Sequence, residues 1–473
     1  MSTDVVVVGS GSTGVSAAVQ AKQLGLNVIM IEKNPGLGGT SAVTEGYGGI
    51  NTELQTQQGI HYDVKDVLLQ AEGYHHWFAD ANLLKKFYEN SGETFSWLQS
   101  LGVKFTGLRN LGANKLNTWH LYDGGGKALT ETLAENAKKM GVEILTDTSG
   151  KELIMKDGKV AGIKATHSDG SNLTIKAPVV ILATGGYSDN PEMLEKYAKV
   201  NADNVIDAGI PGRTGDGINM ALKVGASDKN LKGGLMAFGA MMKGAPYGGT
   251  LHNGIGRQPL LRVNQDGMRF TDESLLARDW GAYGAAHRLQ GTVYQIASKA
   301  NLDNFVQNKF PRDMTPEGKI PTFFEDLDKY MKKEKTQVVI ADTIEELASK
   351  LNMNEEQLKA TVDQYNADCQ TGVDSQFGKD PKFLIAPGEN GPYYAFKLDL
   401  GYYATTDGLA ITTDAQVLDK KGKVIPGLYA GGGDAGGLNG ESYDVSLVPG
   451  SQQGWAVNSG RFAAQDAAKY LKK

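Results

Sequence analysis

The most constraining feature of this chain is a glycine-rich turn near its start. Residues 4–8 read Asp-Val-Val-Val-Val, a β-branched run typical of a buried parallel strand. Residues 9–14 follow as Gly-Ser-Gly-Ser-Thr-Gly, and residues 15–24 are small and apolar, as in a helix packed on a sheet. The first glycine permits the tight turn, the second lets backbone approach a pyrophosphate, and the third lets helix and strand touch. The pattern predicts a βαβ unit whose helix N-terminus binds a dinucleotide.

A second predicted strand, residues 27–31, is closed by Glu32. A carboxylate at this distance from the glycine turn accepts hydrogen bonds from ribose hydroxyls, and it would repel a 2′-phosphate. A plain glycine turn of an α/β protein is the alternative to this interpretation.

Another glycine-rich loop comes directly after Glu32. Residues 33–41 read Lys-Asn-Pro-Gly-Leu-Gly-Gly-Thr-Ser, and residues 46–49 read Gly-Tyr-Gly-Gly. NAD does not require such a loop. FAD does, because the backbone must follow the pyrophosphate toward the flavin. The loop therefore favours FAD.

Composition narrows the class of protein. The 473 residues suggest two or three domains, and 61 glycines are many. A net charge of −6 gives no sign of a nucleic-acid-binding surface, and no apolar run reaches the roughly 18 residues of a membrane span. Cys369 is the only cysteine, which excludes an internal disulfide and an iron–sulfur cluster. Redox chemistry must then use an organic cofactor. Since the chain opens on the first strand, we expect a cytoplasmic protein without a signal peptide.

Later segments define the domain organisation. Residues 178–186 predict a buried strand that ends in a glycine turn, residues 427–434 predict another, and residues 451–470 predict a final helix. The composition changes near residue 235 and changes back near residue 403. The predicted fold class is α/β: a discontinuous Rossmann-like FAD-binding domain over residues 1–235 and 403–473, with an inserted α+β capping domain over residues 236–402.

Four local predictions accompany this division. Residues 61–101 predict two helices, the second capped by Asp80, and residues 325–370 look helical. Residues 405–418 read as a hairpin. His75 and His76 are expected on a helix surface rather than as a metal pair, because adjacent residues diverge on a helix.

Taken in order, the motifs resemble the flavoprotein family of fumarate reductases, succinate dehydrogenase flavoprotein subunits and 3-ketosteroid dehydrogenases. The segments that carry the resemblance are residues 9–14, 32, 38–41, 183–186, 214–217, 263–270 and 426–432. The resemblance implies FAD in the first domain and a substrate held under the capping domain. Members that attach FAD covalently have a histidine beside the Gly-Gly loop. Thr40 and Ser41 follow Gly39 here, so we expect noncovalent FAD.

The resemblance also indicates which residues contact FAD. They come from the glycine-rich segments and from the start of the last helix: Gly9, Gly11, Ser12, Thr13, Gly14, Glu32, Lys33, Gly38, Gly39, Thr40, Ser41, Gly46, Gly48, Gly49, Thr184, Gly185, Gly186, Gly215, Asp216, Gly433, Asp434, Ser451, Gln452 and Gln453.

The catalytic residues of the family are matched only in part. Members that reduce a C=C bond use an arginine as the proton donor, in a context that resembles residues 277–279, so Arg278 is the expected donor. Arginine is a poor acid, and it can serve only where hydride addition makes a strongly basic carbon. Arg257 resembles a second, relaying arginine, but the glutamate between them is missing. The alternative for Arg278 is an ion pair on the domain surface.

The family's dicarboxylate-binding residues are missing. No histidine follows His287, and residues 440–447 contain no arginine. Tyr443 stands there instead and resembles the tyrosine with which 3-ketosteroid dehydrogenases bind a ketone, with Gly450 as the partner amide. Two donors on one carbonyl oxygen form an oxyanion hole for an enolate. Tyr402 and Tyr403 alternate faces if they lie on a strand, and Tyr403 is the expected site residue.

The predicted activity is hydride transfer between flavin N5 and an activated C=C bond of a neutral, bulky, enone-like or cyclic substrate, of the steroid or isoflavonoid kind. One alternative is a soluble fumarate reductase, which would need a carboxylate-binding residue such as His120 or His252. Others are a 3-ketosteroid dehydrogenase and a noncatalytic flavin electron carrier. The electron donor or acceptor is expected to be external, either NADH or a redox partner.

Overall fold

The computed structural model describes residues 1–111, 116–307 and 320–472. The chain forms two compact units. The first consists of Met1–Lys199, Gly209–Met236 and Tyr403–Lys473, and the second of Val200–Ala208 and Ala237–Tyr402. Residues 200–208, which the sequence assigns to the first domain, belong to the second unit because strand β11 (Val205–Asp207) pairs with β16 (Tyr393–Thr405), Val205 opposite Leu400.

A six-stranded sheet forms the centre of the first unit. Its order is β17-β18-β10-β1-β2-β6, with bounds Gln416–Leu418, Val424–Ala430, Val179–Leu182, Val5–Val8, Val28–Ile31 and Glu143–Leu145. All pairs are parallel except β17 with β18. The residues of β1, β2 and β10 are all buried, as expected for parallel strands covered on both faces. The glycine turns after β1, β10 and β18 therefore lie at one edge of the sheet, where the carboxyl ends of the strands meet.

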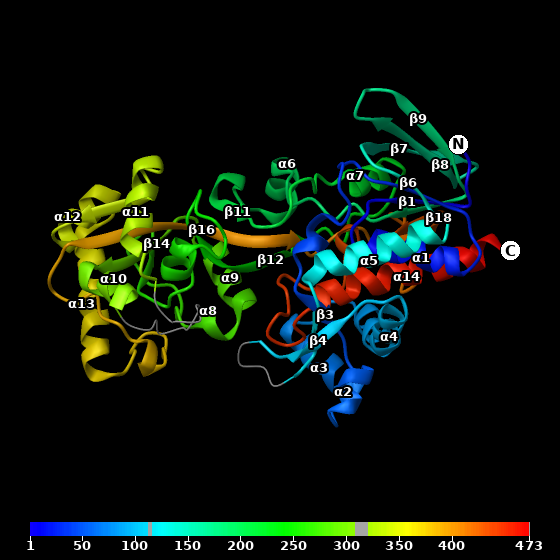
Figure 1. Cartoon of the computed structure of the whole chain (residues 1–473). Coiled ribbons are helices and arrows are strands. Elements are labelled where there is room, and N and C mark those ends of the chain that lie inside the picture. The colour runs from blue at the N-terminus through cyan, green and yellow to red at the C-terminus, as the bar shows by residue number, and fades with distance from the viewer. Residues whose placement is uncertain (112–115, 308–319, 473) are drawn as a thin grey trace. The chain divides into compact units, whose positions relative to one another are not determined.

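Helices α1 (Ser12–Gln23), α5 (Gly125–Lys139) and α14 (Ser451–Leu471) lie together in the first unit (Figure 1). Helices α1 and α14 approach closely because small residues line the contact: a Cβ at Gly460 would lie 2.2 Å from the Thr13 carbonyl oxygen. Their alanines and valines share one buried cluster with β1, β2 and α5. This packing fixes the first turn of α1 against the body of α14.

The remaining elements of the first unit surround this sheet. Strands β7, β8 and β9, between residues 148 and 176, form a three-stranded sheet, and Asp80 caps α4 by accepting from Asn82 N at 2.9 Å. His75, expected on a helix surface, is instead buried at the C-terminus of α3. The bounds are β3 Gly46–Gly48, β4 Phe105–Arg109, β5 Trp119–Tyr122, β7 Thr148–Lys156, β8 Lys159–His167, β9 Asn172–Lys176, α2 Glu53–Gln57, α3 Val64–Tyr74, α4 Ala81–Ser100, α6 Pro191–Met193 and α7 Asp216–Lys223.

The second unit combines a mixed sheet with helices. Strand β16 is its longest strand and pairs with β11, β12, β14 and β15. The bounds are β12 Leu235–Met241, β13 Arg262–Asn264, β14 Val293–Ser298, β15 Val338–Ala341, α8 Leu275–Arg278, α9 Trp280–Arg288, α10 Lys299–Gln307, α11 Phe323–Lys333, α12 Ile344–Leu351 and α13 Glu355–Thr371. The expected helical stretch 325–370 thus contains strand β15. Within the expected hairpin 405–418, Ile411 forms an isolated antiparallel bridge with Val417, and the regular strand β17 pairs with β18.

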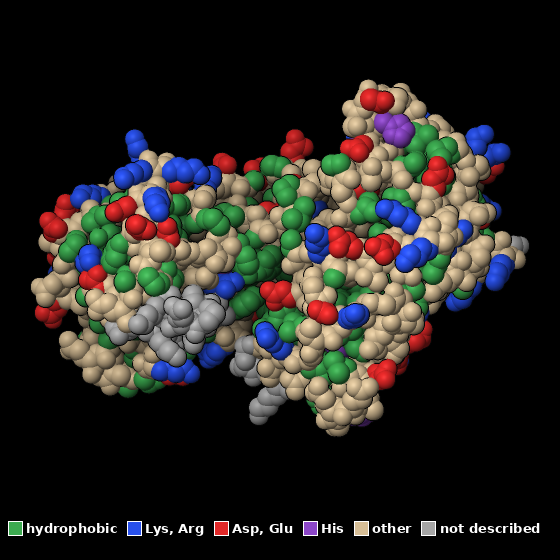
Figure 2. Space-filling view, viewed as in Figure 1, with side chains coloured by type: hydrophobic (Ala, Val, Ile, Leu, Met, Phe, Trp, Pro, Cys, Tyr) green, Lys and Arg blue, Asp and Glu red, His purple; other side chains and the backbone are tan. Residues whose placement is uncertain are grey.

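These two architectures confirm the predicted fold class, a Rossmann-like α/β domain with an inserted α+β domain. Among the described residues, no helix is long and apolar enough to cross a membrane, and no group of three His, Cys, Asp or Glu side chains is arranged to hold a metal ion. On the face shown in Figure 2, basic and acidic side chains are interspersed.

Candidate active site

The turn after β1 is the first part of the candidate FAD-binding site. Gly9 has φ of +105°, and a Cβ there would lie 2.2 Å from the Ala183 carbonyl oxygen. A Cβ at Gly14 would lie 1.9 Å from the Gly9 oxygen. Gly11 differs, since no atom lies within 3.4 Å of its Cβ position and its nearest neighbour is Ser41 Oγ at 3.5 Å. Protein packing thus requires glycine at positions 9 and 14, whereas the space beside Gly11 is open to a ligand.

This difference gives a paired prediction. Gly14→Ala should prevent folding or cost several kcal/mol of unfolding free energy, because backbone atoms would overlap. Gly11→Ala should leave the flavin-free protein as stable as the wild type, since φ at Gly11 is −64°. It should nevertheless lower FAD retention about tenfold or more, because the methyl group would occupy the space where the pyrophosphate approaches. Thermal unfolding of stripped protein and the flavin-to-protein ratio are the measurements. Full retention by Gly11→Ala would contradict the assignment.

Glu32 lies at the end of β2 and links the first two glycine loops. Its Oε2 accepts from Ser10 N at 3.0 Å and from Ser10 Oγ at 2.7 Å, while Oε1 accepts from Asn34 N at 2.9 Å. Ser10 Oγ in turn accepts from Gly38 N at 3.1 Å. The carboxylate is therefore fixed in orientation, at the position where the ribose of a dinucleotide is expected.

The second glycine loop folds against the first. Gly38 has φ of +106° and Gly39 of +48°, and Ser41 Oγ accepts from Ser12 N at 3.0 Å. Lys33, expected at the cofactor, pairs with Asp216 at 2.8 Å and donates to Thr214 Oγ1 at 2.8 Å. Thr40 Oγ1 accepts from Ile210 N at 3.3 Å. The structure thus gives Lys33, Asp216 and Thr40 partners within the protein, and their contact with FAD stays a prediction.

Asp434 joins the turns that follow β10 and β18. Its side chain is fully buried and accepts from Thr184 N at 2.6 Å, from Thr184 Oγ1 at 2.9 Å and from Gly186 N at 3.1 Å. Burial raises the pKa of this carboxyl to about 6, although these hydrogen bonds favour the ionised form. Gly433 packs on the Gly185 backbone, and Gly215 N donates to the Gly186 oxygen at 2.9 Å. Asp434 is the connection between the two turns.

A neighbouring carboxyl gives a pH prediction. Asp407 Oδ2 accepts from Gly233 N at 2.7 Å and from Tyr187 Oη at 3.0 Å, and burial raises its pKa from 3.8 to about 6. Because the folded protein binds this proton more tightly than the unfolded chain, the contribution to stability is complete below pH 4 and lost as pH rises through 6. In the wild type, this carboxyl should lower the free energy of unfolding by on the order of 3 kcal/mol between pH 4 and 7, and Asp407→Asn should abolish that decrease. Urea unfolding at both pH values measures this loss, and equal loss in both proteins would contradict the prediction.

The N-terminus of α14 forms the last wall. Gly450, with φ of +83°, precedes the helix, and its carbonyl accepts from Gly48 N at 2.9 Å. A Cβ at Gly48 would lie 2.2 Å from Gly450 C, so β3 is held directly against this turn. Gln453 Nε2 donates to Ser12 Oγ at 2.7 Å, and Gln452 Oε1 accepts from Asn439 Nδ2 at 2.9 Å. The remaining predicted cofactor residues pack nearby: Thr13 against Gly431 and Gly432, Gly46 on the His120 backbone, and Gly49 on the Tyr47 ring.

Tyr443 and Gly450 are brought together, as the sequence predicts for a shared role. Gly450 N donates to Tyr443 Oη at 2.9 Å, and Tyr443 is buried. Burial and the Asp444 carboxylate hold the pKa of Tyr443 well above its usual value, while the hydrogen bond from the Gly450 amide acts against them. The hydroxyl stays protonated at neutral pH. The amide contacts the hydroxyl oxygen in this structure, and the role of Tyr443 and Gly450 toward a substrate stays a prediction.

The two candidate arginines belong to the second unit. Arg278 is the last residue of α8, and its guanidinium pairs with Asp272 while its side chain stays 53% exposed. Arg257 donates to Tyr247 Oη at 2.6 Å and lies over the rings of Tyr247 and Trp280. Because Trp280 opens α9, directly after the residue that caps it, Arg257 lies beside the α8–α9 junction that carries Arg278.

Tyrosines 402 and 403 alternate as expected for a strand. Tyr402 is buried, whereas Tyr403 is partly exposed and its carbonyl accepts from Arg213. His120, a possible carboxylate ligand, is fully buried, with Nε2 2.7 Å from Thr52 Oγ1 and Nδ1 2.9 Å from the Thr118 oxygen. Burial lowers its pKa to about 4, so it is neutral at pH 7. His252 is also buried and accepts from Gly248 N at 2.9 Å through Nδ1.

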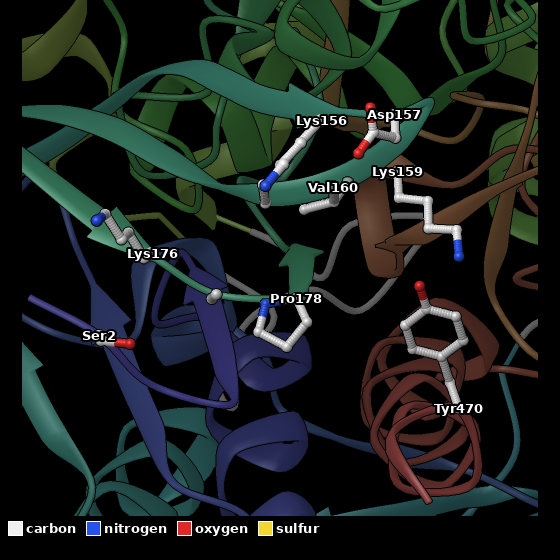
Figure 3. Close-up of a pocket in the computed structure, with 10 residues that line it drawn as sticks. Ser2, Lys156, Asp157, Lys159, Val160, Lys176, Pro178 and Tyr470 are labelled. Carbon is white, nitrogen blue, oxygen red and sulfur yellow. The ribbon is translucent and has the colours of Figure 1, made fainter. Parts of the chain in front are cut away.

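An open groove lies elsewhere on the first unit (Figure 3). It is lined by the hairpin of β7 and β8, the end of β9 and the last turn of α14: Ser2, Lys156, Asp157, Lys159, Val160, Ala161, Lys176, Ala177, Pro178 and Tyr470. None of the glycine turns and none of the predicted catalytic residues reaches it, so it is not the candidate active site.

Known proteins match this chain along nearly its whole length. Residues 4–442 match the FAD binding domain family. A vinyl phenol reductase from Lactiplantibacillus plantarum is 35% identical, over 99% of this chain and 97% of that protein. The open conformation of a flavocytochrome c3 fumarate reductase is 29% identical, with a TM-score of 0.72 over 100% of this chain and 79% of that one.

A third group of proteins, the 3-ketosteroid dehydrogenases, shares this fold. A 3-ketosteroid delta1-dehydrogenase from Sterolibacterium denitrificans matches with a TM-score of 0.76 and 20% identity, over 99% of both chains. The open space at Gly11, the fixed carboxylate of Glu32 and the glycine loops at one sheet edge fit FAD. The chain therefore belongs to the FAD binding domain family, as a homologue of the fumarate reductase flavoproteins and 3-ketosteroid dehydrogenases, and it is an FAD-dependent oxidoreductase acting on CH–CH groups.

Proposed function

We propose that this enzyme reduces the C=C bond of a neutral, cyclic substrate whose alkene is conjugated with a ketone or phenol oxygen. The observation that carries the proposal is the Tyr443 hydroxyl, buried and fixed by the Gly450 amide at the N-terminus of α14. A protonated hydroxyl held in this way can donate to a substrate oxygen on which negative charge develops. The 35% identical vinyl phenol reductase supports a substrate with such an oxygen.

The residues available for binding favour a neutral substrate over a dicarboxylate. Residues 440–447 contain no lysine or arginine, and no histidine follows His287. His120 is neutral, and both of its nitrogens have partners in the protein. A desolvated carboxylate needs paired, charged donors, so fumarate should bind weakly.

Bound FAD supplies a hydride to one alkene carbon when reduced. Arg278 delivers a proton to the other carbon, and Asp272 holds its guanidinium during the transfer. Arg257 replenishes that proton, and Tyr403 forms part of the substrate wall. The reverse reaction, desaturation of a ketosteroid, would use the same groups, so a 3-ketosteroid dehydrogenase is the second candidate function.

FAD is held noncovalently in this proposal, because Thr40 and Ser41 occupy the positions after Gly39 where a histidine would attach it. Acid precipitation should therefore leave all the flavin in the supernatant. The electrons come from an external donor, NADH or a redox partner.

Product analysis tests the proposed function. The purified holoenzyme is supplied with an excess of reductant and, in separate reactions, with 4-vinylphenol, a 3-keto-4-ene steroid, an isoflavonoid and fumarate. We expect at least one neutral compound to gain two hydrogens at a rate far above that for fumarate. Reduction of fumarate alone would contradict the proposal, and desaturation of a saturated ketosteroid without any reductase activity would favour the second candidate.

A further inference from the structure

A buried cluster of four charged side chains lies in the second unit: Arg269, Glu273, Asp374 and Lys379. The exposed fraction of each of these side chains is at most 1%. Arg269 donates from Nε to Glu273 Oε1 and from Nη2 to Glu273 Oε2, both at 2.9 Å. It also donates from Nη1 and Nη2 to the two carboxylate oxygens of Asp374, at 2.8 and 2.9 Å. One guanidinium therefore binds two buried carboxylates, each through two hydrogen bonds.

Glu273 receives further hydrogen bonds besides those from Arg269. Lys379 Nζ donates to its Oε2 at 3.1 Å, and the Arg262 backbone N donates to its Oε1 at 3.3 Å. Lys379 Nζ is held in turn by a hydrogen bond to Tyr365 Oη at 2.7 Å. Although burial alone would raise it, the cations Lys379 and Arg269 hold the pKa of the Glu273 carboxyl below its usual value. Glu273 is therefore ionised and held in one orientation.

Stability alone does not account for this cluster. Burying charges costs desolvation free energy, and well-packed apolar residues of similar volume often replace a buried ion-pair cluster without loss of stability. The cluster does provide a fixed geometry, because each of its hydrogen bonds requires a defined position of both partners. The place of Glu273 in the chain indicates what is fixed, since it directly follows Asp272, the partner of Arg278.

Asp272 orients the Arg278 guanidinium from the turn before α8. Its Oδ1 accepts from Ser274 N at 2.8 Å, and its Oδ2 accepts from Ser274 Oγ at 2.9 Å and pairs with Arg278. The Asp272 carbonyl accepts from Leu275 N at 3.0 Å, where α8 begins. Helix α8 has four residues, too few to form a stable helix by themselves. The position of Arg278, its last residue, therefore depends on how the preceding turn is held.

We propose that Glu273 is a positioning residue for the proton donor Arg278. The buried ion pairs of Glu273 fix the turn of residues 272–274, this turn fixes the Asp272 carboxylate, and Asp272 holds the Arg278 guanidinium in the orientation from which it donates. The inference rests on the role of Arg278 in the proposed function and deepens it. Because Glu273 is buried and ionised, it takes no part in the proton transfer itself and acts only through Arg278.

The kinetics of Glu273→Gln test this role first. The amide keeps the size of the side chain but removes the charge that Arg269 and Lys379 bind, so the turn is no longer fixed. We expect kcat for alkene reduction to fall about tenfold to a hundredfold, as for a catalytic group displaced by about 1 Å. The KM for the alkene, the flavin content and the rate of flavin photoreduction should stay at their wild-type values.

Asp374→Asn is the matched control. Asp374 is buried in the same cluster and binds the same guanidinium, but its oxygens accept from the backbone of residues 376–379 rather than holding the turn before α8. This variant should lower the thermal unfolding temperature about as much as Glu273→Gln does, while kcat stays close to the wild-type value. Equal losses of kcat in the two variants would overturn the inference, because general destabilisation of the second unit would then explain both.

A double-mutant cycle with Arg278→Gln measures whether Glu273 acts through Arg278. We expect Glu273→Gln to cause no further loss of kcat in the Arg278→Gln background. The same fold loss in both backgrounds would overturn the inference. Glu273→Asp keeps the charge but shortens the side chain by one methylene group. It should show a smaller loss with the same dependence on Arg278, and it takes the place of Glu273→Gln in the cycle if that variant does not fold.

The cycle can be measured with any alkene that the wild type reduces, so its outcome does not depend on the proposed substrate class. Reduction of fumarate alone would contradict the proposed function, and the cycle measured with fumarate would still decide the role of Glu273. Wild-type activity in Arg278→Gln would remove the proton donor from the proposed function and would overturn the inference with it.

Discussion

Arg278→Gln should lower the rate of alkene reduction about a thousandfold, within the range for loss of a general acid. The glutamine amide cannot deliver a proton to a basic carbon, and no other cation is proposed to reach that carbon. Arg278→Lys should recover part of the rate, because an ammonium can donate from nearly the same position, although without the geometry of the guanidinium that pairs with Asp272.

The measurements for Arg278 distinguish a loss of proton transfer to the substrate from a loss of flavin binding or flavin reduction. Product formation should fall in Arg278→Gln while the flavin content and the rate of flavin photoreduction stay at their wild-type values. Arg109→Gln, which alters an exposed arginine of β4, serves as the control. A variant that keeps more than a tenth of the wild-type kcat would show that Arg278 is only a surface ion-pair partner of Asp272.

Tyr443→Phe should lower kcat/KM for neutral alkenes by about a hundredfold or more, the usual cost of losing one donor to a developing oxyanion. The same change leaves the partly buried Gly450 amide without its acceptor, which should lower the free energy of unfolding by about 1 kcal/mol. Both effects come from one hydroxyl group.

Tyr74→Phe provides a matched control for that variant. Tyr74 Oη donates to the Tyr443 carbonyl oxygen at 3.1 Å, so its loss disturbs the same backbone without removing the proposed donor. We expect nearly normal catalysis there. If both variants lose activity equally, the tyrosine pair supports the loop and the donor assignment is wrong.

The glycine pattern made most of the first unit predictable. A turn in which an added Cβ at Gly9 or Gly14 would lie 1.9–2.2 Å from a backbone oxygen can be built only from glycine, so residues 9–14 specify the β1–α1 connection by themselves. The buried valines of β1 and β10 identify their parallel strands in the same way. Strand β15 could not be predicted between the helical segments, because a run of four apolar residues fits a turn of a buried helix equally well.

The partners of individual polar residues could not be predicted. Lys33 and Asp216 are far apart in the sequence, and only the folded chain shows that they pair. The same holds for His75 and Asp444, which no motif connects and which meet because the end of α3 packs against residue 440. Sequence patterns report on backbone geometry, whereas such contacts depend on how separate elements pack.

Anaerobic reoxidation of the reduced flavin tests the central claim most directly. The holoenzyme is photoreduced and mixed with fumarate, a 3-keto-4-ene steroid, an isoflavonoid or 4-vinylphenol, and recovery of the oxidised flavin band is followed. We predict rapid recovery with a neutral, conjugated compound and slow recovery with fumarate. Rapid recovery with fumarate and none with the neutral compounds would contradict the role of Tyr443 and would require a dicarboxylate site built from other residues.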